Sequence, residues 1–332
     1  MIQSIALLLK NTIGDNMNKI WLVGTGNIAI EYAKVLKNLN VEYIAIGRGK
    51  TNVDKFIAAT QHDAIEGGLE NFLKLSPEIP SHAIVTVNVE SLSLTATMLL
   101  KYGIKTILLE KPGVCNPSEI YDLVQLTREK NANVLLAYNR RFYASTLKAQ
   151  EIIKEDGGVT SFVFEFTEWA HKIAPMFDGS ERFKYWFLGN SSHVVDLAFY
   201  LGGNPVEMSS FTSGSIEWHP NASVFSGAGK TDKGALFSYH ANWKAPGRWF
   251  VEICTSKHRL YFKPMEALQI QEIGRLELNP VVLNDDLDRL FKPGLYLQVK
   301  CFLDNELSRF CTLDEQQHMI DNYYLKIGNY SR

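Results

Sequence analysis

Short runs of hydrophobic residues alternate, from Asn18 to about residue 138, with longer segments in which hydrophobic residues recur every three or four positions. The runs are typical of buried β-strands and the periodic segments of amphipathic helices. The expected strands are 19–23, 41–46, 83–87, 104–109 and 133–138, and the expected helices are 27–39, 51–59, 69–75, 91–102 and 117–130. Strands that alternate with helices of ten or so residues predict a doubly wound parallel sheet of the Rossmann type.

The pattern changes after Arg141. A predicted helix over 142–154 is followed by strand-like runs joined by loops rich in Gly, Asn, Pro and Ser, which indicates an antiparallel sheet. The expected strands are 160–169, 207–218, 235–243, 249–254 and 259–262, with helices over 193–201, 293–307 and 313–327. The fold class is therefore α/β, with an N-terminal extension (1–16), a Rossmann domain (17–138) and an α+β domain with a large, mainly antiparallel sheet (139–332).

The composition is that of an ordinary globular protein and excludes several classes. Of the 332 residues, 46% are hydrophobic and 21% are charged, and the formal net charge is -2. Proteins that coat nucleic acid normally carry a basic excess, so we expect no nucleic-acid partner. The apolar stretch 5–9 is far shorter than the ~20 residues of a membrane-spanning helix. It also lacks the preceding basic residue of a signal peptide, so we expect no membrane association and little contribution to the fold from residues 1–16.

Cysteine and histidine usage points to neither disulfides nor a metal. The four cysteines, Cys115, Cys254, Cys301 and Cys311, form no CxxC pair and have no histidines at metal-ligand spacing. Free thiols in a reducing compartment are the simplest interpretation, which predicts a cytoplasmic protein. Most of the histidines are scattered without acidic partners, and we expect no metal site.

A glycine-rich turn follows the first expected strand. The segment GTGNIA, residues 24–29, matches G-x-G-x-x-[G/A] and opens the expected helix 27–39. In a βαβ unit the first glycine permits the tight turn, the second lets the backbone approach a pyrophosphate, and the helix N-terminus offers free N–H groups to it. The residues expected to bind a dinucleotide here are Gly24, Thr25, Gly26, Asn27 and Ile28. A glycine turn without a ligand is the alternative.

The end of the second expected strand indicates which dinucleotide binds. NAD-binding proteins usually place an acidic residue there for the ribose 2′-hydroxyl, whereas this chain has Gly47-Arg48-Gly49-Lys50. An arginine can clamp a 2′-phosphate in a fork geometry. We therefore expect Gly47 and Arg48 to contact the cofactor, with NADP favoured and NAD as the alternative. The alternative is that Arg48 and Lys50 belong to a solvent-exposed basic turn that binds no ligand.

Lys111 follows the expected strand 104–109 in the sequence Glu110-Lys111-Pro112. Ligands bind outside the carboxyl ends of the strands in open α/β sheets, so Lys111 should point into the crevice. A positioned ammonium there can hydrogen-bond a substrate hydroxyl and favour loss of its proton. Taken alone, a lysine in a Lys-Pro turn more often lies simply at the surface.

Four segments together resemble the Gfo/Idh/MocA oxidoreductases, the glucose–fructose oxidoreductase and inositol dehydrogenase group. They are GTGNIA, LLEKP, AYNRRF and SSHVVDLAFYLGG, in family order and spread over most of the chain from Met17. The resemblance implies a Rossmann domain, an open-faced sheet domain that often mediates oligomerisation, and hydride exchange between NAD(P) and a sugar or related polyol. It also implies that Lys111 is catalytic and contacts the cofactor, that Glu110 lies beside the nicotinamide ribose, and that Val87 and Asn88 border the cofactor. A homodimer or homotetramer through the second sheet is expected.

His193 is the candidate for proton transfer. It shares a face of the expected helix with Asp196, and its ordinary pKa suits proton transfer near neutral pH. By resemblance His193 is the catalytic base, whereas Asp196 is expected to support local structure. Many family members carry Asp four residues before this histidine, and the residue here is Gly189. His193 then acts alone, or the substrate supplies an acidic group, or the chemistry is lost.

The remaining candidates follow the last strand of the first sheet and precede His193. Asn139 and Arg140 should face the crevice and, with Asn190 and His193, are expected to bind substrate. A salt-bridged start of a helix is the alternative for residues 139–141. The expected activity is NADP-preferring, reversible oxidation of a C–OH group in a sugar, sugar derivative or nucleotide sugar, including precursors of surface polysaccharide. The alternatives are a C=N or C=C reductase of the same fold and a catalytically silent nucleotide-binding protein.

Overall fold

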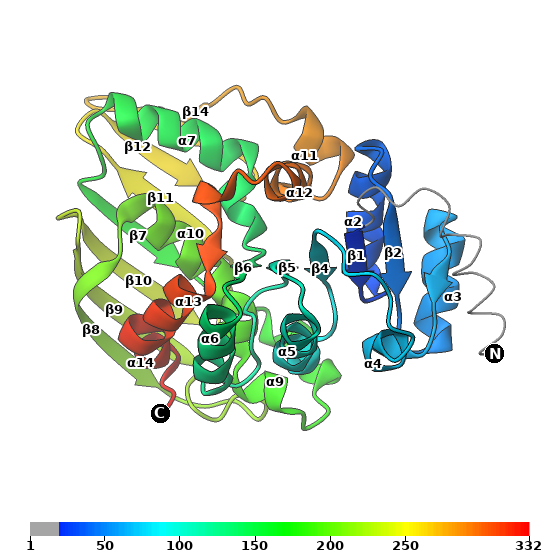
Figure 1. Cartoon of the computed structure of the whole chain (residues 1–332). Helices are drawn as coiled ribbons and strands as arrows, with labels where there is room; N and C mark the ends of the chain where they lie inside the picture. The colour runs from blue at the N-terminus through cyan, green and yellow to red at the C-terminus, as the bar shows by residue number, and fades with distance from the viewer. Residues whose placement is uncertain (1–19, 332) are drawn as a thin grey trace.

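The computed structural model describes residues 20–331, and two sheets organise them. Figure 1 shows the two sheets side by side, with helices between and around them. The expected extension 1–16, and the first residues of the expected unit 17–138, lie outside the described residues. Both expected sheets are present, so the α/β fold class is confirmed.

Sheet A is the doubly wound sheet, with strand order β15-β6-β5-β4-β1-β2-β3. Its strands are β1 (Ile20–Val23), β2 (Tyr43–Ile46), β3 (Ala64–Ile65), β4 (Ala83–Val85), β5 (Thr106–Leu109), β6 (Asn133–Leu136) and β15 (Cys311–Thr312). All neighbouring pairs are parallel except β15 with β6. The short strand β3 is too brief to have been predicted from a periodic pattern.

Alternate residues of the sheet A strands face two hydrophobic layers. Leu22 and Leu108 belong to one core cluster, whereas Val23 and Leu109 belong to the other. Helices α2 (Asn27–Asn38) and α3 (Lys50–Thr60) contribute to the first cluster; α4 (Gly68–Leu73), α5 (Leu92–Tyr102) and α6 (Glu119–Glu129) contribute to the second. Burial on both faces explains why these strands are continuous hydrophobic runs in the sequence.

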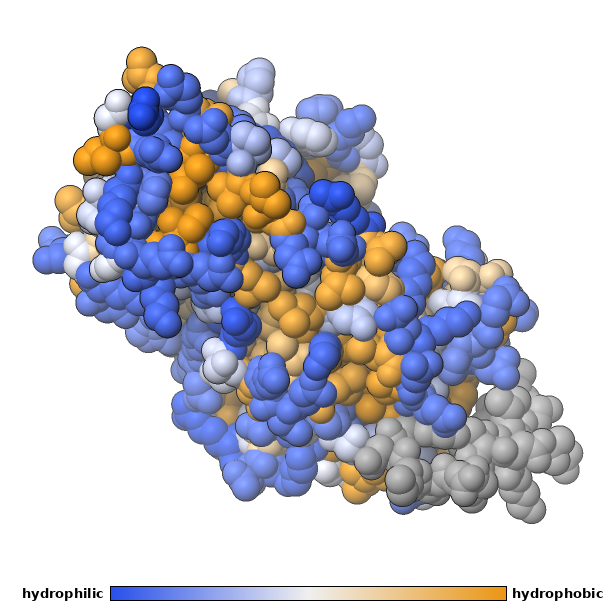
Figure 2. All heavy atoms as spheres, turned by 90° about the horizontal axis from the view of Figure 1, so that it is seen from above, coloured by the Kyte–Doolittle hydropathy of each residue, from blue (hydrophilic) through white to orange (hydrophobic). Residues whose placement is uncertain are grey.

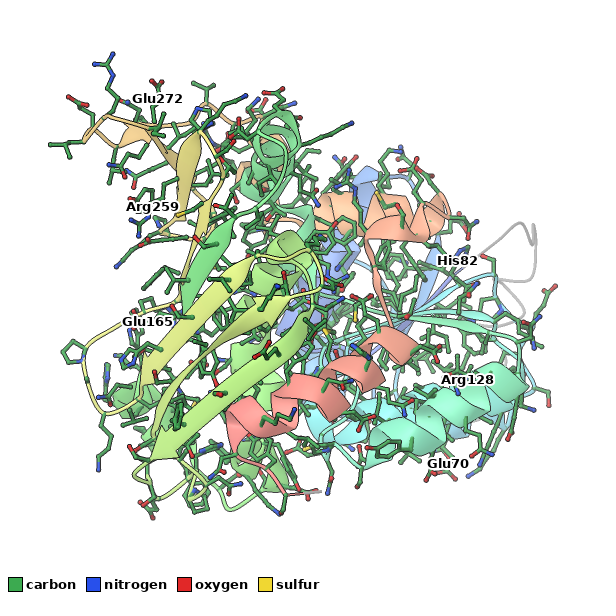
Figure 3. All side chains as sticks on the ribbon, turned by 90° about the vertical axis from the view of Figure 1, so that its left-hand side faces the viewer. Glu70, His82, Arg128, Glu165, Arg259 and Glu272 are labelled. Carbon is green, nitrogen blue, oxygen red and sulfur yellow. The ribbon has the colours of Figure 1, made fainter. Side chains whose placement is uncertain are left out.

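Sheet B is mainly antiparallel, and only β7 and β10 pair in parallel. Its strands are β7 (Ser161–Glu165), β8 (Pro205–Ser213), β9 (Val224–Thr231), β10 (Leu236–Asn242), β11 (Phe250–Cys254), β12 (His258–Phe262), β13 (Gln269–Glu272) and β14 (Asn279–Pro280), in the order β14-β13-β12-β11-β7-β10-β9-β8. Helix α10 (Ser192–Gly202) packs against β7 and β11. Figure 3 looks onto the other face, where Glu165 of β7 and Arg259 of β12 are labelled.

The structure corrects several predicted strands of this sheet. Strand β9 was not predicted, because its sequence VFSGAGKT contains two glycines that weaken the strand pattern. A Cβ at Gly227 would come within 2.4 Å of the Tyr239 ring, and one at Gly229 within 2.7 Å of the Phe237 ring. The aromatic rings of β10 therefore require glycine on β9. The predicted strand 160–169 ends at Glu165, and the predicted strand 207–218 lies at 205–213.

Short helical elements connect the two sheets and close the chain. They are η1 (Val89–Ser91), η2 (Asn139–Phe142), α7 (Ala144–Glu155), α8 (Ala170–Ile173), η3 (Ala174–Met176), α9 (Glu181–Lys184), η4 (Phe187–Ser191), α11 (Asp286–Leu290), α12 (Leu295–Leu303), η5 (Leu307–Arg309), α13 (Leu313–Met319), η6 (Ile320–Tyr324) and α14 (Leu325–Gly328). The end of the chain returns to sheet A: α12 packs on α2, β15 pairs with β6, and α13 packs on α6. The expected Rossmann domain, residues 17–138, does not include these later elements α12, β15 and α13.

The segment 273–290, which follows β13 and ends with α11, exposes much of its hydrophobic surface. Ile273, Leu276, Val282 and Leu290 are all at least 75% exposed. Figure 2 shows hydrophobic side chains among mainly hydrophilic ones on the upper face of the molecule. Among residues 20–331, no helix combines the length and the apolar character needed to cross a bilayer.

Candidate active site

A groove of about 790 Å³ lies at the carboxyl ends of β1, β2 and β4. Gly24 lies at its base with φ +118°, and a Cβ there would come within 2.4 Å of the Thr86 hydroxyl oxygen. Only glycine fits this close approach of two strand ends. The expected residues that line the groove are Gly24, Thr25, Gly26, Ile28, Arg48, Val87 and Asn88.

The start of α2 suits a phosphate. Gly26 is its N-cap residue and supplies no side-chain cap, and a Cβ at Gly26 would meet no protein atom within 4 Å. The neighbouring protein atoms do not require glycine here, so the open space on this side fits a group outside the protein. Free N–H groups at a helix start are a ready anion site. The residues present therefore fit the diphosphate of a dinucleotide.

Arg48 and Lys50 have different surroundings. The amine of Lys50 pairs with the Asp54 carboxylate at 3.1 Å on the surface of α3. Arg48 lines the groove and packs beside Gly68, where a Cβ would lie 3.6 Å from the Arg48 side chain. Of the two cations, Arg48 is therefore the one that lines the groove. Gly47 packs behind the groove, where a Cβ would lie 2.5 Å from Thr25 and Val53.

Some expected cofactor residues lie outside this groove, and some lining residues were missed. Asn27, Gly47, Glu110 and Lys111 do not line it. The missed lining residues include Asn52, Gly67, Gly68, Asn71, Thr86 and Ser91. Thr86 could have been found from its place at the end of the expected strand 83–87, whereas Gly67 and Gly68 follow the unpredicted β3. A second groove, of about 860 Å³, runs from α2 to β3 and contains none of the expected site residues.

Lys111 lies just beyond β5 and reaches toward the second sheet. Its Nζ atom donates a 2.6 Å hydrogen bond to the carbonyl oxygen of Gly189 in η4. The pKa of Lys111 is lowered to about 8, mainly by burial; Arg140 and Lys292 act in the same direction, and Glu110 and Glu168 oppose it. A lysine with this pKa can both donate and accept a proton close to neutral pH.

Glu110 accepts a 3.0 Å hydrogen bond from the Tyr32 hydroxyl of α2. Burial raises the pKa of the Glu110 carboxyl, although Lys111 beside it acts in the opposite direction. The side chain is thus tied to the helix that opens at the glycine turn. Its contact with the nicotinamide ribose stays a prediction.

His193 lies in the first turn of α10, directly after the π-helical turn η4. Its Nδ1 atom is buried and has no hydrogen-bond partner among the described residues. Its ring centroid lies 6.0 Å from that of Tyr138 and 6.4 Å from that of Trp249. Burial lowers the pKa of His193 well below its ordinary value, and Arg140, Lys111 and Lys292 act in the same direction. The imidazole is therefore neutral near pH 7 and has a nitrogen available to accept a proton.

A buried carboxylate, Glu168, lies next to the position of the missing aspartate. It is 2% exposed and accepts hydrogen bonds from Asn190 Nδ2 at 3.0 Å and Ser191 Oγ at 2.7 Å. Burial raises the pKa of Glu168, while these two donors and the cations Arg248 and Lys111 oppose the rise. The sequence analysis missed Glu168, because it lies in what was predicted as the end of a strand. The negative charge of Glu168 raises the pKa of Lys111 and so opposes the effect of burial.

The expected substrate residues fall into different environments. The Asn139 amide donates to the carbonyl oxygen of Pro293 at 2.9 Å, which holds the loop carrying Lys292 beside the site. The Asn190 amide is bonded to Glu168, as described above. Arg140 has a buried Nε without a hydrogen-bond partner among the described residues. Whether these three side chains bind substrate stays a prediction.

Arg141 and Asp196 form a buried ion pair. Arg141 donates to both carboxylate oxygens of Asp196, at 2.6–3.2 Å, and to Glu315 at 2.8 Å. The two partners of the main pair are 3% and 1% exposed. The alternative of a salt-bridged helix start therefore holds for Arg141, and Asp196 supports local structure. Within residues 20–331, no group of three or more His, Cys, Asp and Glu side chains could hold a metal ion.

Comparison with known proteins supports the fold. No family model and no curated protein matches the sequence. Among solved structures, a dehydrogenase (MviM) from Clostridium difficile is similar with a TM-score of 0.75 and 18% identity, over 95% of this chain and 99% of that one. The UDP-N-acetylglucosamine 3-dehydrogenase GnnA from Acidithiobacillus ferrooxidans is similar with a TM-score of 0.73 and 12% identity, over 94% and 97%.

A levoglucosan dehydrogenase in complex with NADH and levoglucosan is also similar, with a TM-score of 0.73 and 13% identity, over 94% of this chain and 96% of that one. These structures are Gfo/Idh/MocA-type oxidoreductases, and the chain has their two-domain fold. The expected resemblance is therefore confirmed at the level of fold.

Proposed function

We propose that this protein is an NAD(P)-dependent oxidoreductase that reversibly oxidises a C–OH group of a sugar or sugar derivative. The observation that carries the proposal is the hydrogen bond from Lys111 to Gly189, which joins the strand end beside the dinucleotide groove to the turn that presents His193. The contact supports the proposal because it links two segments that each carry a group able to exchange protons. Neighbours of the same fold that act on sugars support this assignment.

Each residue has a defined part in the reaction. The Lys111 ammonium donates a hydrogen bond to the substrate oxygen and stabilises negative charge that develops on it. The neutral imidazole of His193 accepts the hydroxyl proton as the C–H bond breaks. The nicotinamide, when bound, supplies the acceptor for the hydride. In the reverse direction His193 returns the proton to the carbonyl oxygen.

Residues at the glycine turn hold the cofactor. Thr25, Gly26 and the N–H groups at the start of α2 bind the diphosphate, and Val87 and Asn88 border the cofactor further along the groove. Arg48 binds a 2′-phosphate, which makes NADP the preferred cofactor. The position of Arg48 inside the groove, next to Gly68, supports this preference.

The proposed substrate is a sugar, a sugar derivative or a nucleotide sugar. Such a reaction would suit the biosynthesis of a surface polysaccharide. Solved structures of similar fold include enzymes named for levoglucosan and for UDP-N-acetylglucosamine. We also propose a cytoplasmic location, which the four free cysteines support. We also propose that the protein forms a homodimer or homotetramer through the outer face of sheet B. Sedimentation velocity would measure the number of subunits.

Cofactor titration followed by a substrate panel tests the proposal. Fluorescence titration with NADPH and NADH should show saturable binding, with NADPH the tighter ligand. Incubation of the protein with NADP⁺ and a panel of hexoses, sugar acids, sugar phosphates and nucleotide sugars should then produce absorbance of the reduced cofactor. Failure to bind either dinucleotide would refute every oxidoreductase function. Cofactor binding without turnover of any panel member would favour a silent nucleotide-binding protein.

A further inference from the structure

The guanidinium of Arg140 contacts aromatic rings where that of Arg141 contacts carboxylates. Its Cζ atom lies 4.9 Å from the ring centroid of Trp249 and 5.8 Å from that of Tyr143. Its Nε atom is buried and, among the described residues, has no hydrogen-bond partner. A buried charged donor without an acceptor costs free energy, and native structures rarely leave one unpaired. Arg140 is therefore suited to binding a ligand, whereas Arg141 serves the fold.

Trp249 presents a second unpaired donor at the same place. The residue is 6% exposed, and its indole Nε1 has no hydrogen-bond partner within the part of the chain that the structure describes. Its ring contacts Arg140, and its centroid lies 6.4 Å from that of the His193 ring. The two donors come from η2 and from the residue before β11, and the Trp249 ring lies near the candidate catalytic histidine. Two neighbouring side chains from separate elements thus each have an N–H group without an acceptor.

The charges around these donors also favour an anion. Arg248 stacks on Trp249 with its Cζ 4.5 Å from the ring centroid. The cations that influence this cluster are Lys111, Arg140, Arg248 and Lys292, and the carboxylates are Glu110, Glu168 and Glu266. Glu110 and Glu168 already accept hydrogen bonds from Tyr32, Asn190 and Ser191. The four cations outnumber the three carboxylates, so the groups named here leave a net positive charge at the site.

We propose that the sugar oxidised at this site carries an anionic group, a carboxylate or a phosphate, and that Arg140 and Trp249 bind it. This inference rests on the proposed function and specifies its substrate class. Arg140 Nε and Trp249 Nε1 each donate a hydrogen bond to an oxygen of the anion, and Arg248 and Lys292 add attraction. Because the Trp249 ring lies 4.9 Å from Arg140 Cζ and 6.4 Å from the His193 ring, the anionic group binds near the catalytic histidine.

Binding of an anion also improves the catalytic histidine. Arg140 and Lys292 are among the cations that hold the pKa of His193 below its ordinary value. A negative charge beside them offsets their influence and raises the pKa of His193 toward neutral pH. The substrate then supplies part of the negative charge that an aspartate at position 189 would provide.

Calorimetric titration of the NADPH-loaded protein tests the inference with matched ligands. Each neutral hexose is compared with its uronic acid and its 6-phosphate, in the glucose, galactose and mannose series. At least one acid or phosphate should bind about 30-fold or more tightly than its neutral parent, and the arm that does so identifies the anion. Arg140→Gln should abolish this preference, and Trp249→Phe, which keeps an aromatic ring and loses the Nε1–H, should reduce it.

The control variant is Arg128→Gln, at an exposed position on α6, which should keep the preference. Circular dichroism checks that each variant is folded. If Arg140→Gln does not fold, the test rests on Trp249→Phe. Equal binding of neutral and anionic sugars, or a preference that survives in Arg140→Gln and Trp249→Phe, overturns the inference and leaves the proposed function standing. Absence of dinucleotide binding overturns the proposed function itself.

Discussion

The Nζ atom of Lys111 donates a 2.6 Å hydrogen bond to the carbonyl oxygen of Gly189, which lies 78 residues further along the chain. The bond connects the end of β5 in sheet A with the π-helical turn that leads into α10 of the second sheet's domain. Lys111 and His193, the two candidate catalytic groups, thus come from separate parts of the sequence. Their relative position depends on this contact between the two parts of the molecule.

Replacement of Lys111 by Met should abolish turnover. The change removes the ammonium that stabilises charge on the substrate oxygen, and we expect kcat to fall about 10³-fold. NADPH affinity should stay within about twofold, because Lys111 does not line the groove below the glycine turn. Steady-state kinetics and fluorescence titration measure the two quantities. Lys148→Met, at an exposed position on α7, is the control, and unchanged kcat in Lys111→Met would refute the catalytic part of Lys111.

The rate of carbonyl reduction should fall as pH rises through about 8. The lowered pKa of Lys111 means that its ammonium form, which donates the hydrogen bond, is largely present at pH 7 and is lost above about 8. A profile of kcat/KM against pH measures this descending limb. Lys111→Arg keeps its charge to higher pH, so its limb should move upward. A limb at the same pH in both proteins would assign it to another group.

Gly189→Asp should raise activity. A Cβ at position 189 would meet no atom within 4 Å, so a side chain there has room, and its backbone carbonyl still accepts from Lys111. The added carboxylate supplies the acid-base group that the family resemblance places four residues before His193, and we expect about a tenfold increase in kcat. Gly189→Asn is the matched uncharged control. Equal rates for the two variants would show that a carboxylate at this position adds nothing.

Arg48→Ala should weaken NADPH binding and leave NADH binding nearly unchanged. Loss of a charge-assisted contact to the 2′-phosphate corresponds to about 1.5–3 kcal/mol, or roughly 10- to 100-fold in Kd. Fluorescence titration with both cofactors measures the ratio. Lys50→Ala, which removes a cation already paired with Asp54, should have little effect on either. A similar loss for both cofactors in Arg48→Ala would contradict the NADP preference.

Asp196→Asn should destabilise the protein strongly. It leaves the buried Arg141 guanidinium without its main counter-charge, which costs about 3–5 kcal/mol in the free energy of unfolding. Urea denaturation measures that loss. The double variant Arg141→Met/Asp196→Leu should recover much of it, because neither charge then remains buried. If the double variant is as unstable as Asp196→Asn, the ion pair itself stabilises the fold, beyond the neutralisation of one buried charge by the other.

The strands of sheet A were predictable because both of their faces are buried, which leaves continuous hydrophobic runs in the sequence. The glycine turn was predictable for another local reason, since its motif is a short sequence pattern and the backbone at Gly24 accepts only glycine. Strand β9 was not predictable, because its glycines are required by Tyr239 and Phe237 of the neighbouring strand. Strand β15 was missed because two residues carry no periodic pattern.

Sequence by itself determined the fold class, the dinucleotide groove at the glycine turn and the candidates Lys111 and His193, because each depends on local pattern or on the order of short motifs. Only the tertiary structure separated Arg140 from Arg141. The two residues are adjacent and chemically identical, but Asp196 and Glu315 lie beside one and Trp249 beside the other. Tertiary structure likewise brought Glu168 beside Lys111. Charge compensation and burial act between residues far apart in the chain, and no local pattern of residue types encodes them.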